Sequence, residues 1–308
     1  MKRFLICIFY ILLLTGCTDI HTRLLPMILA VDTAESVQFA AQTSLEAEII
    51  SAQAETALQI QDALRNASGA ELSTGHLSML AVSGNPCGVL QDFFQAQLLA
   101  PTCSVLYVPT DACGQLKNGN LPEPTQLQAA VETGILPERT ADIVLADLWG
   151  GSGITAVCTP DSDDLTLALW SSEACCGKLS ADACRGLALL GKRRKSFVFA
   201  ANGIAYRLTS DALQIRLTQN DTLKIEISGT VATEPPLTEA AAARLSDMLT
   251  AALKESALAY GADLLFLREH AIRCNITAAR SCSQDEWREL LRTAECSVAL
   301  NAQISRSA

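Results

Sequence analysis

The residue with the clearest chemistry is Cys17, which directly follows a short apolar segment near the start of the chain. Two basic residues precede an eleven-residue apolar run, 4–14, and the letters LTGC then occupy positions 14–17. Basic residues, a short apolar run and small residues at a cut are typical of a secretory leader. A cysteine at the cut is the bacterial lipobox, whose thiol receives a diacylglyceryl group before the chain is cleaved in front of it. We therefore expect residues 1–16 to be a lipoprotein signal peptide and Cys17 to carry the lipid.

The apolar run itself is too short to be a membrane span. Eleven helical residues cover roughly half of a ~30 Å hydrocarbon core. Anchoring would therefore come from the acyl chains, such as palmitate, because two chains hold a protein stably at a bilayer. The alternatives are an ordinary secretory leader with Cys17 as a bystander and an uncleaved signal anchor. In each case the rest of the chain is exported.

The composition argues against some classes of partner and against a disordered chain. The 308 residues include 23 Lys+Arg and 33 Asp+Glu, a formal net charge of −10. An acidic chain is a poor match for nucleic acid or anionic lipid as the main partner. With 49% hydrophobic residues the chain is also too apolar for a disordered protein and long enough for a sizeable core.

The cysteines allow two interpretations. Besides Cys7 in the leader and Cys17, ten remain, at positions 87, 103, 113, 158, 175, 176, 184, 274, 282 and 296. Export permits disulfides, and an even number is compatible with five bridges. Free cysteines also serve as small buried hydrophobic residues. There is no C-x-x-C pair, and the three histidines are not within four residues of one another, so we expect no zinc site.

The sequence offers little for catalysis. Gly151 and Gly153 fit a dinucleotide-binding fingerprint loosely, but a predicted strand follows them where the fingerprint needs a helix N-terminus. His76 stands at the start of a predicted strand, where a packed or capping role is expected. We therefore expect no catalytic residue and no cofactor, and the chain is not predicted to be an enzyme.

The first half of the chain alternates between strands and helices. Predicted strands cover 24–32, 37–44, 76–83 and 104–108, and predicted helices cover 55–66, 89–99, 124–133 and 138–149. Predicted strands at 154–159 and 165–170 and a helix at 180–190 follow a turn-rich stretch. The basic run 192–195 then marks either a solvated linker or a docking patch for an acidic surface.

The last hundred-odd residues give a clearer pattern. Asn202-Gly203 is a strong hairpin signal, and alternating apolar residues around it and around Asn220-Asp221 predict an antiparallel meander with one solvated face. A long helix is expected from Thr238 to Gly261, a short helix after the capping box Ser283-x-x-Glu286, and a closing strand at 298–304.

These elements define the expected architecture. The fold class is α+β, with a mixed α/β N-terminal region and a C-terminal domain of meander, long helix, short helix and closing strand. The expected divisions are the signal peptide 1–16, an N-terminal α/β domain 17–150, a small middle domain 151–194 and a C-terminal α+β domain 195–308.

Several short motifs occur in one order along nearly the whole chain. They are LTGCTD (14–19), ILAVD (28–32), GHLSMLAV (75–82), CGKL (176–179), RGLALLG (185–191), ADLL (262–265), EW (286–287) and the closing strand. In these the chain resembles the Ger(x)C-type spore germination lipoproteins, the C subunits of nutrient germinant receptors, as a divergent member. The family usually has Trp where Thr18 stands and Gly where Ala30 stands.

The resemblance implies a three-domain α/β protein tethered by lipid to the outer face of the spore inner membrane. It would work with membrane-embedded germinant receptor subunits to turn a nutrient signal into germination. Only Cys17 is carried over as a site residue. The alternative is a lipid-anchored solute-binding protein of a transporter, but such proteins need repeated α/β halves and no second copy of the N-terminal pattern follows residue 195. A purely structural envelope lipoprotein is a third hypothesis.

Overall fold

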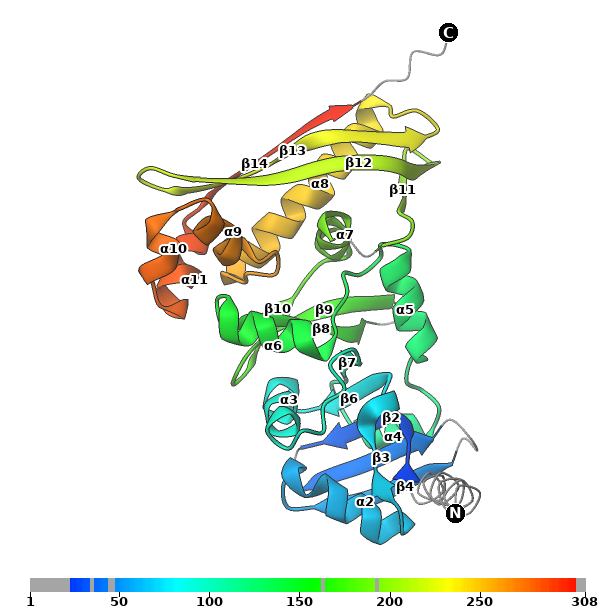
Figure 1. Ribbon diagram of the computed structural model, residues 1–308. Helices are drawn as coiled ribbons and strands as arrows, with labels where there is room; N and C mark the ends of the chain where they lie inside the picture. Colours follow the sequence, from blue (N-terminus) through cyan, green and yellow to red (C-terminus); the bar gives the residue numbers. More distant parts are fainter. Residues whose placement is uncertain (1–22, 34–35, 44–47, 162–163, 192–193, 303–308) are drawn as a thin grey trace, which may run out of the picture.

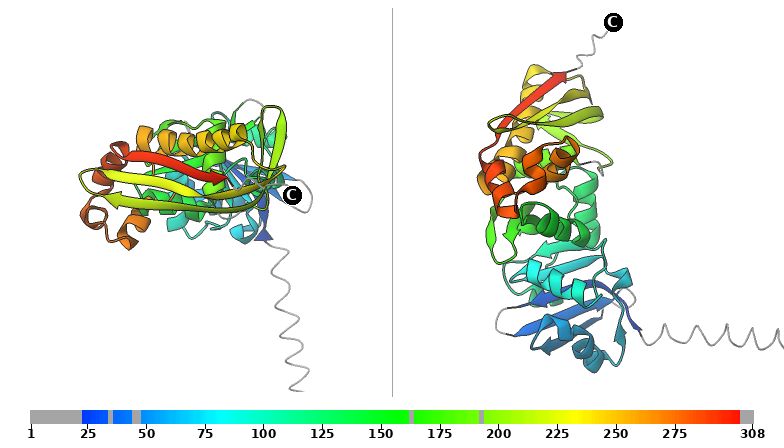
Figure 2. Two further views of the ribbon diagram at one scale, coloured as in Figure 1. Left: turned by 90° about the horizontal axis from the view of Figure 1, so that it is seen from above. Right: turned by 60° about the vertical axis from the view of Figure 1, so that its left-hand side comes forward.

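The described residues fold into an elongated body with an eight-stranded sheet, a four-stranded sheet and a separate pair of short strands. The computed structural model describes residues 23–33, 36–43, 48–161, 164–191 and 194–302. Figures 1 and 2 show the N-terminal strands at one end of the body and the second sheet, with β14 (Glu295–Ala302), at the other. Across these ranges, we find no helix with the length and apolar character that a membrane crossing requires.

The larger sheet has eight strands in the order β10-β9-β8-β7-β6-β2-β3-β4. The four central strands pair in parallel and the two strands at each edge pair antiparallel. Their bounds are β2 (Pro26–Asp32), β3 (Val37–Thr43), β4 (Ile49–Ala54), β6 (Met79–Ser83), β7 (Ser104–Tyr107), β8 (Ile154–Asp161), β9 (Asp164–Ser171) and β10 (Cys175–Lys178). β1 (Arg23–Leu24) and β5 (Glu71–Leu72) form a separate parallel pair. Central parallel strands are covered on both faces, which explains why β2 and β6 are continuous apolar runs in the sequence.

The pairing of β7 with β8 is the shortest in the larger sheet. β7 and β8 pair only through Leu106 opposite Cys158, whereas β8 and β9 pair along their whole length. The expected boundary between residues 150 and 151 falls just before β8, at this joint. Strands of both expected segments belong to one sheet, and the division of the chain into domains stays a prediction.

Helices cover both faces of this sheet. One face carries α2 (Ile60–Ser68), α3 (Pro86–Gln95) and α6 (Ala141–Gly150), and the other carries α4 (Ala112–Lys117), α5 (Pro124–Glu132) and α7 (Ala181–Leu190). Short 3-10 turns, η2 (Ala57–Gln59) and η3 (Thr74–His76), precede α2 and β6. The predicted helix stop at Ser68-Gly69 is confirmed, since Gly69 has a φ of +73°.

The second sheet has the order β11-β12-β13-β14. β11 (Val198–Ala201), β12 (Ile204–Gln219) and β13 (Leu223–Glu234) are antiparallel, and β14 pairs in parallel with β13. Asn202 and Gly203 both have positive φ, 50° and 77°, as the predicted two-residue hairpin turn requires. The meander is therefore confirmed.

One face of the second sheet packs on helices. α8 (Glu239–Ala252) begins at the predicted cap, Thr238, whose side chain accepts a hydrogen bond from Ala241 N. The helix continues through a π-helical turn, η4 (Leu253–Leu258), toward Gly261. α9 (Leu267–Arg273), α10 (Thr277–Ser281) and α11 (Gln284–Arg292) follow. The capping box at the start of α11 is present, and the α+β fold class is confirmed.

α7 joins the two sheets. It packs on the larger sheet with one side and on α8 with the other, and Figure 1 shows it between the sheets. The two helices approach closely at Gly186, where an added Cβ would lie 2.1 Å from Met248 O. Arg244 on α8 also holds Asp182 on α7 through two 2.5 Å hydrogen bonds. The two sheets are thus fixed to each other through side-chain contacts between α7 and α8.

Candidate functional site

A buried ion pair lies where the larger sheet meets the helices that follow α8. Arg139, in the loop before α6, donates to Asp147 Oδ2 of α6 at 2.6 Å, and Thr155 of β8 donates to the same oxygen at 3.1 Å. Both charged side chains are almost fully buried. Burial raises the pKa of Asp147 to about 6, and the neighbouring Arg139 acts in the opposite direction. The pair fixes α6 to β8 and provides one side of the junction.

Asp263 provides the other side of the junction. Its carboxylate accepts hydrogen bonds from Leu267 N at 2.6 Å, Arg268 N at 2.9 Å and Trp287 Nε1 at 2.9 Å. The backbone N–H of Asp263 donates to Ser152 Oγ, two residues before β8, at 3.1 Å. Burial raises the pKa of Asp263, and the three hydrogen bonds that its carboxylate accepts act against that rise. The side chain of Asp263 therefore caps α9 and holds α11, and its backbone N–H links this turn to the chain just before β8.

α11 makes further contacts across the same junction. Arg288 donates to Ser152 O at 2.8 Å, and Gln284 donates to the last carbonyls of α6, Leu148 O at 3.0 Å and Trp149 O at 2.9 Å. These carbonyls have no partner within their own helix, so the glutamine satisfies them. The C-terminal helices are therefore fixed to the larger sheet by polar contacts.

A groove lies beside this polar junction. We call it the junction groove; it has a volume of about 790 Å³ and lies between the loop before α6, α7, β12 and α9. Most of its lining is apolar, from Val131, Leu136, Pro137, Ile143, Leu187, Ala188, Leu190, Leu213, Ile215, Leu264, Leu265, Phe266 and Leu267. Phe266, the N-cap of α9, has a φ of 54° and is 40% exposed. An exposed phenylalanine beside an apolar hollow is typical of an interaction surface.

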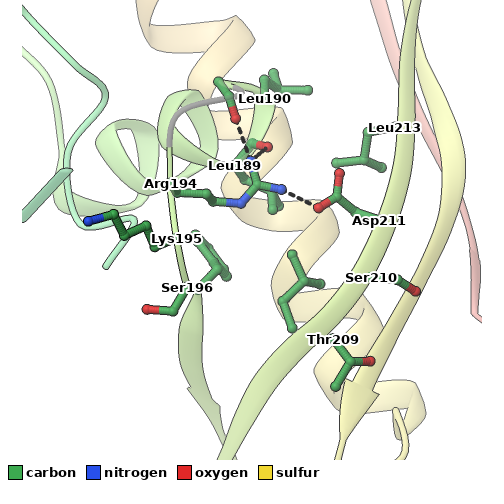
Figure 3. Close-up of a pocket in the computed structure, with 12 residues that line it drawn as sticks. Leu189, Leu190, Arg194, Lys195, Ser196, Thr209, Ser210, Asp211 and Leu213 are labelled. Carbon is green, nitrogen blue, oxygen red and sulfur yellow. Dashed lines mark hydrogen bonds and ion pairs between the residues drawn. The ribbon is translucent and has the colours of Figure 1, made fainter. Parts of the chain in front are cut away.

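Arg194 closes one end of the junction groove. Its guanidinium donates to Leu189 O at 2.6 Å, at the end of α7, and forms an ion pair with Asp211 of β12 (Figure 3). It also donates to Ala188 O at 3.3 Å. A cation at this end of a helix is stabilised by the carbonyl dipoles. A smaller hollow of about 330 Å³ shares Leu190, Gly191, Arg194 and Leu213 with the groove. Arg194 therefore joins the chain after α7 to the second sheet.

Four basic side chains line the two hollows, and each of them is in an ion pair. Arg139 pairs with Asp147, Arg194 with Asp211, Lys195 with Glu132 and Arg273 with Glu269. Acidic groups therefore offset the charge of the basic lining, and the apolar side chains of the junction groove are its main contact surface.

An exposed aromatic pair lies away from the groove. Phe94 of α3 and Trp149 of α6 have ring centroids 4.9 Å apart in an edge-on arrangement and are 52% and 50% exposed. It is a second apolar contact surface.

The predicted site residue, Cys17, lies outside the described residues, and its lipidation stays a prediction. Lys192 and Arg193 of the basic run lie outside them as well. Of the described residues of that run, Arg194 makes the contacts above and Lys195 Nζ pairs with Glu132 Oε1 of α5 at 2.7 Å. The sequence predicts a packed or capping role for His76; the packed role is wrong, because the residue is exposed at the end of η3. Strand β8 follows Gly151 and Gly153, as the sequence predicted.

All ten cysteines in the described ranges are free thiols. Five of them are buried, at positions 87, 103, 113, 158 and 184, which fits the interpretation of cysteine as a small core residue. Burial raises the pKa of Cys87, Cys103 and Cys158 to about 12. Within the described part of the chain, no cluster of three or more potential metal ligands occurs.

Sequence reasoning did not find the junction residues. Asp263 and Trp287 lie in two of the short motifs, ADLL and EW, but no local pattern connects them. Their spacing of 24 residues along the chain has no periodic meaning. The signal available was a single acidic residue within the apolar segment 262–265.

Comparison with known proteins supports the fold. No model of a known protein family matches the sequence, and no curated protein matches it. The structure is similar to the crystal structure of the GerBC protein, with a TM-score of 0.51 and 13% sequence identity, over 88% of this chain and 95% of that one. The chain therefore has the fold of GerBC over nearly its full length, as the resemblance in the sequence predicted.

Proposed function

We propose that this chain is a lipid-anchored subunit of a spore nutrient germinant receptor that acts by contact with membrane-embedded partner subunits and not by catalysis. The observation that carries the proposal is the GerBC fold over 88% of the chain. The ordered motifs from the lipobox to the closing strand support it independently, because they come from the sequence and not from the coordinates.

A lipid on Cys17 would also orient the body at the membrane. Arg23, the first described residue, lies six positions after Cys17. Six residues span at most about 20 Å when fully extended. The end of the body with β1 and β2 would therefore stay close to the bilayer. The second sheet, at the opposite end in Figures 1 and 2, would project away from it.

Anchoring would strengthen weak contacts with the partner subunits. Tethering raises the local concentration of the body beside proteins in the same membrane, so an interface of modest affinity is occupied without additional contacts. The junction groove and the exposed pair of Phe94 and Trp149 are two apolar surfaces that such contacts could use.

The solute-binding alternative is not favoured. Such proteins are built from two similar lobes, whereas the two sheets here differ in kind. The larger sheet has a parallel centre with helices on both faces, and the second sheet is an antiparallel meander with one parallel strand added.

The test is to replace Cys17 with alanine in the full chain at its own locus, with Cys176→Ala, an exposed cysteine, as the matched control. We expect wild type and control to be acylated by intact mass, to stay in the membrane fraction and to copurify with multi-span proteins. Cys17→Ala should leave the membrane, and its spores should lose optical density more slowly after nutrient is added. Equal membrane retention of Cys17→Ala, or a wild-type chain without multi-span partners, would show the proposal to be wrong.

A further inference from the structure

A histidine and a cysteine lie one turn apart at the end of α9. Cys274 is the C-cap residue of this helix, and its Sγ lies 3.7 Å from His270 Nε2. Residues four apart are neighbours on one face of a helix, which explains the contact. Cys274 is exposed, and His270 is half-buried and lines the junction groove. This mixed H-x-x-x-C spacing differs from the C-x-x-C and paired-histidine patterns from which a zinc site is usually predicted.

The separation of the two atoms matches that of two ligands on one tetrahedral metal ion. A zinc–sulfur bond of about 2.3 Å and a zinc–nitrogen bond of about 2.0 Å, at an angle of about 109°, place the ligand atoms about 3.5 Å apart. The separation of 3.7 Å in the structure differs from this value by about 0.2 Å, the tolerance usual for a metal site. The two side chains therefore need little movement to bind one ion.

The backbone that carries the pair is held in place. Cys274 N–H donates to His270 O at 2.9 Å, so both residues belong to one helical turn. Leu267 and Ala271 of the same helix are buried, and the carboxylate of Asp263 caps its first turn. Ligands on a fixed element keep the geometry that an ion requires, and they lose less freedom when it binds.

The residue types select the class of ion. A thiolate and an imidazole are ligands of zinc and related transition metals, whereas calcium and magnesium prefer oxygen. Binding requires the thiolate and the neutral imidazole, so Cys274 releases one proton to water when the ion binds. Glu269 and Arg273 of the same turns pair with each other at 3.1 Å, so the charges beside the two ligands are balanced.

We propose that His270 and Cys274 bind one divalent ion of the zinc class as a two-residue chelate, with water in its remaining positions. The ion links residues one turn apart, so it stabilises the end of α9. α9 has seven residues, and a helix this short depends on contacts other than its own hydrogen bonds. Zinc thereby stiffens one wall of the junction groove. The inference does not depend on the receptor assignment, because the metal alone is the ligand.

The direct test is a titration of the full chain, kept reduced and without a histidine tag, with Co²⁺ and then Zn²⁺. We expect one equivalent of Co²⁺ to produce a thiolate-to-cobalt charge-transfer band. Zn²⁺ should displace the Co²⁺, because it binds such ligands more tightly, with a Kd of about 10 μM or lower. No band and no binding of either ion up to about 1 mM would overturn the assignment.

Variants test whether the two residues act as a pair. Cys274→Ser and His270→Ala should each weaken Zn²⁺ binding at least about tenfold. The matched controls are Cys176→Ser, an exposed cysteine whose Sγ donates to the backbone Ala174 O, and His76→Ala, an exposed histidine; both should bind Zn²⁺ like wild type.

One further variant separates chelation from a structural role of the thiol. Cys274→His restores two ligands one turn apart, so it should bind Zn²⁺ while losing the charge-transfer band with Co²⁺. Weaker binding in Cys274→Ser with wild-type binding in His270→Ala would mean a lone thiol and would overturn the pair. Equal losses in a control and in its matched variant would contradict the assignment as well.

The wild-type chain provides a test that needs no variant, should His270→Ala fail to fold. One equivalent of Zn²⁺ should slow the modification of Cys274 by iodoacetamide, while exposed Cys176 in the same sample reacts at an unchanged rate in mass spectrometry. Zn²⁺ should also slow hydrogen exchange of the α9 amides. Equal protection of the two cysteines, or α9 exchange that does not respond to Zn²⁺, would contradict the chelate.

Discussion

Replacing Asp263 with alanine should loosen the junction and the wall of the groove formed by α9. The carboxylate accepts three hydrogen bonds, from Leu267 N, Arg268 N and Trp287 Nε1. Alanine leaves all three buried donors without this acceptor, and each costs about 1 to 3 kcal/mol. Removing a buried charge offsets part of that cost, since burial raises the pKa of Asp263. We expect a net loss of about 3 kcal/mol in the free energy of unfolding.

The assay is urea unfolding together with hydrogen exchange of the α9 amides. Asp263→Asn keeps one acceptor oxygen, so its loss should lie between those of wild type and Asp263→Ala. The matched control is Asp285→Ala on α11, because that carboxylate is 86% exposed and pairs with Arg288 at 3.2 Å. It should change stability by less than about 0.5 kcal/mol. A loss below about 1 kcal/mol in Asp263→Ala, with unchanged exchange in α9, would refute this account of the junction.

Three further predictions concern the core and its titration. Burial raises the pKa of Asp147 from 3.8 to about 6, so protonation of this group stabilises the folded state as the pH falls through 6, and that stabilisation is lost as the pH rises. In wild type, the free energy of unfolding should therefore be higher at pH 5 than at pH 7, and this difference should be about 1 kcal/mol larger than in Asp147→Asn. Equal pH dependence of the two proteins would contradict this. Gly186→Ala should lower the free energy of unfolding, measured with denaturant, by about 3 kcal/mol, because the added Cβ would meet the backbone of α8. The control Gly75→Ala, whose Cβ would have no atom within 4 Å, should stay close to wild type. Similar free energies of unfolding for the two variants would argue against the close approach of α7 and α8. Iodoacetamide should modify exposed Cys274 in the folded chain and buried Cys103 only after unfolding, and mass spectrometry that finds equal rates would argue against the packing described.

Local chemistry accounts for the elements that the sequence predicted well. The Asn202-Gly203 turn, the Thr238 cap and the Ser283-x-x-Glu286 capping box each depend on neighbouring residues only, and all three are present. The predicted helix 138–149 begins three residues later, at Ala141, because the preceding backbone pairs with β7: Val105 N donates to Arg139 O, and Thr140 forms a β-bridge with Ser104.

Elements without a local signal were not predicted. β4 and β10 are edge strands. β4 has two isoleucines followed by small and polar residues, β10 consists of two cysteines, a glycine and a lysine, and in the described part of the chain each pairs with one neighbouring strand. α4 is six residues long and starts where the carboxylate of Asp32, at the end of β2, accepts hydrogen bonds from Ala112 N and Cys113 N. The partner that stabilises such an element is remote in the sequence, so no window of the chain contains it.

By itself, the sequence determined the turns, the caps, the α+β order of elements and the lipobox motif, since each is a short pattern of neighbouring residue types. The tertiary structure alone decided the junction around Asp263 and the junction groove. These features bring together the loop before α6, α7, β12 and α9, which lie far apart along the chain. Their positions depend on how α7 and α8 pack the two sheets together, and that packing is a property of the whole fold.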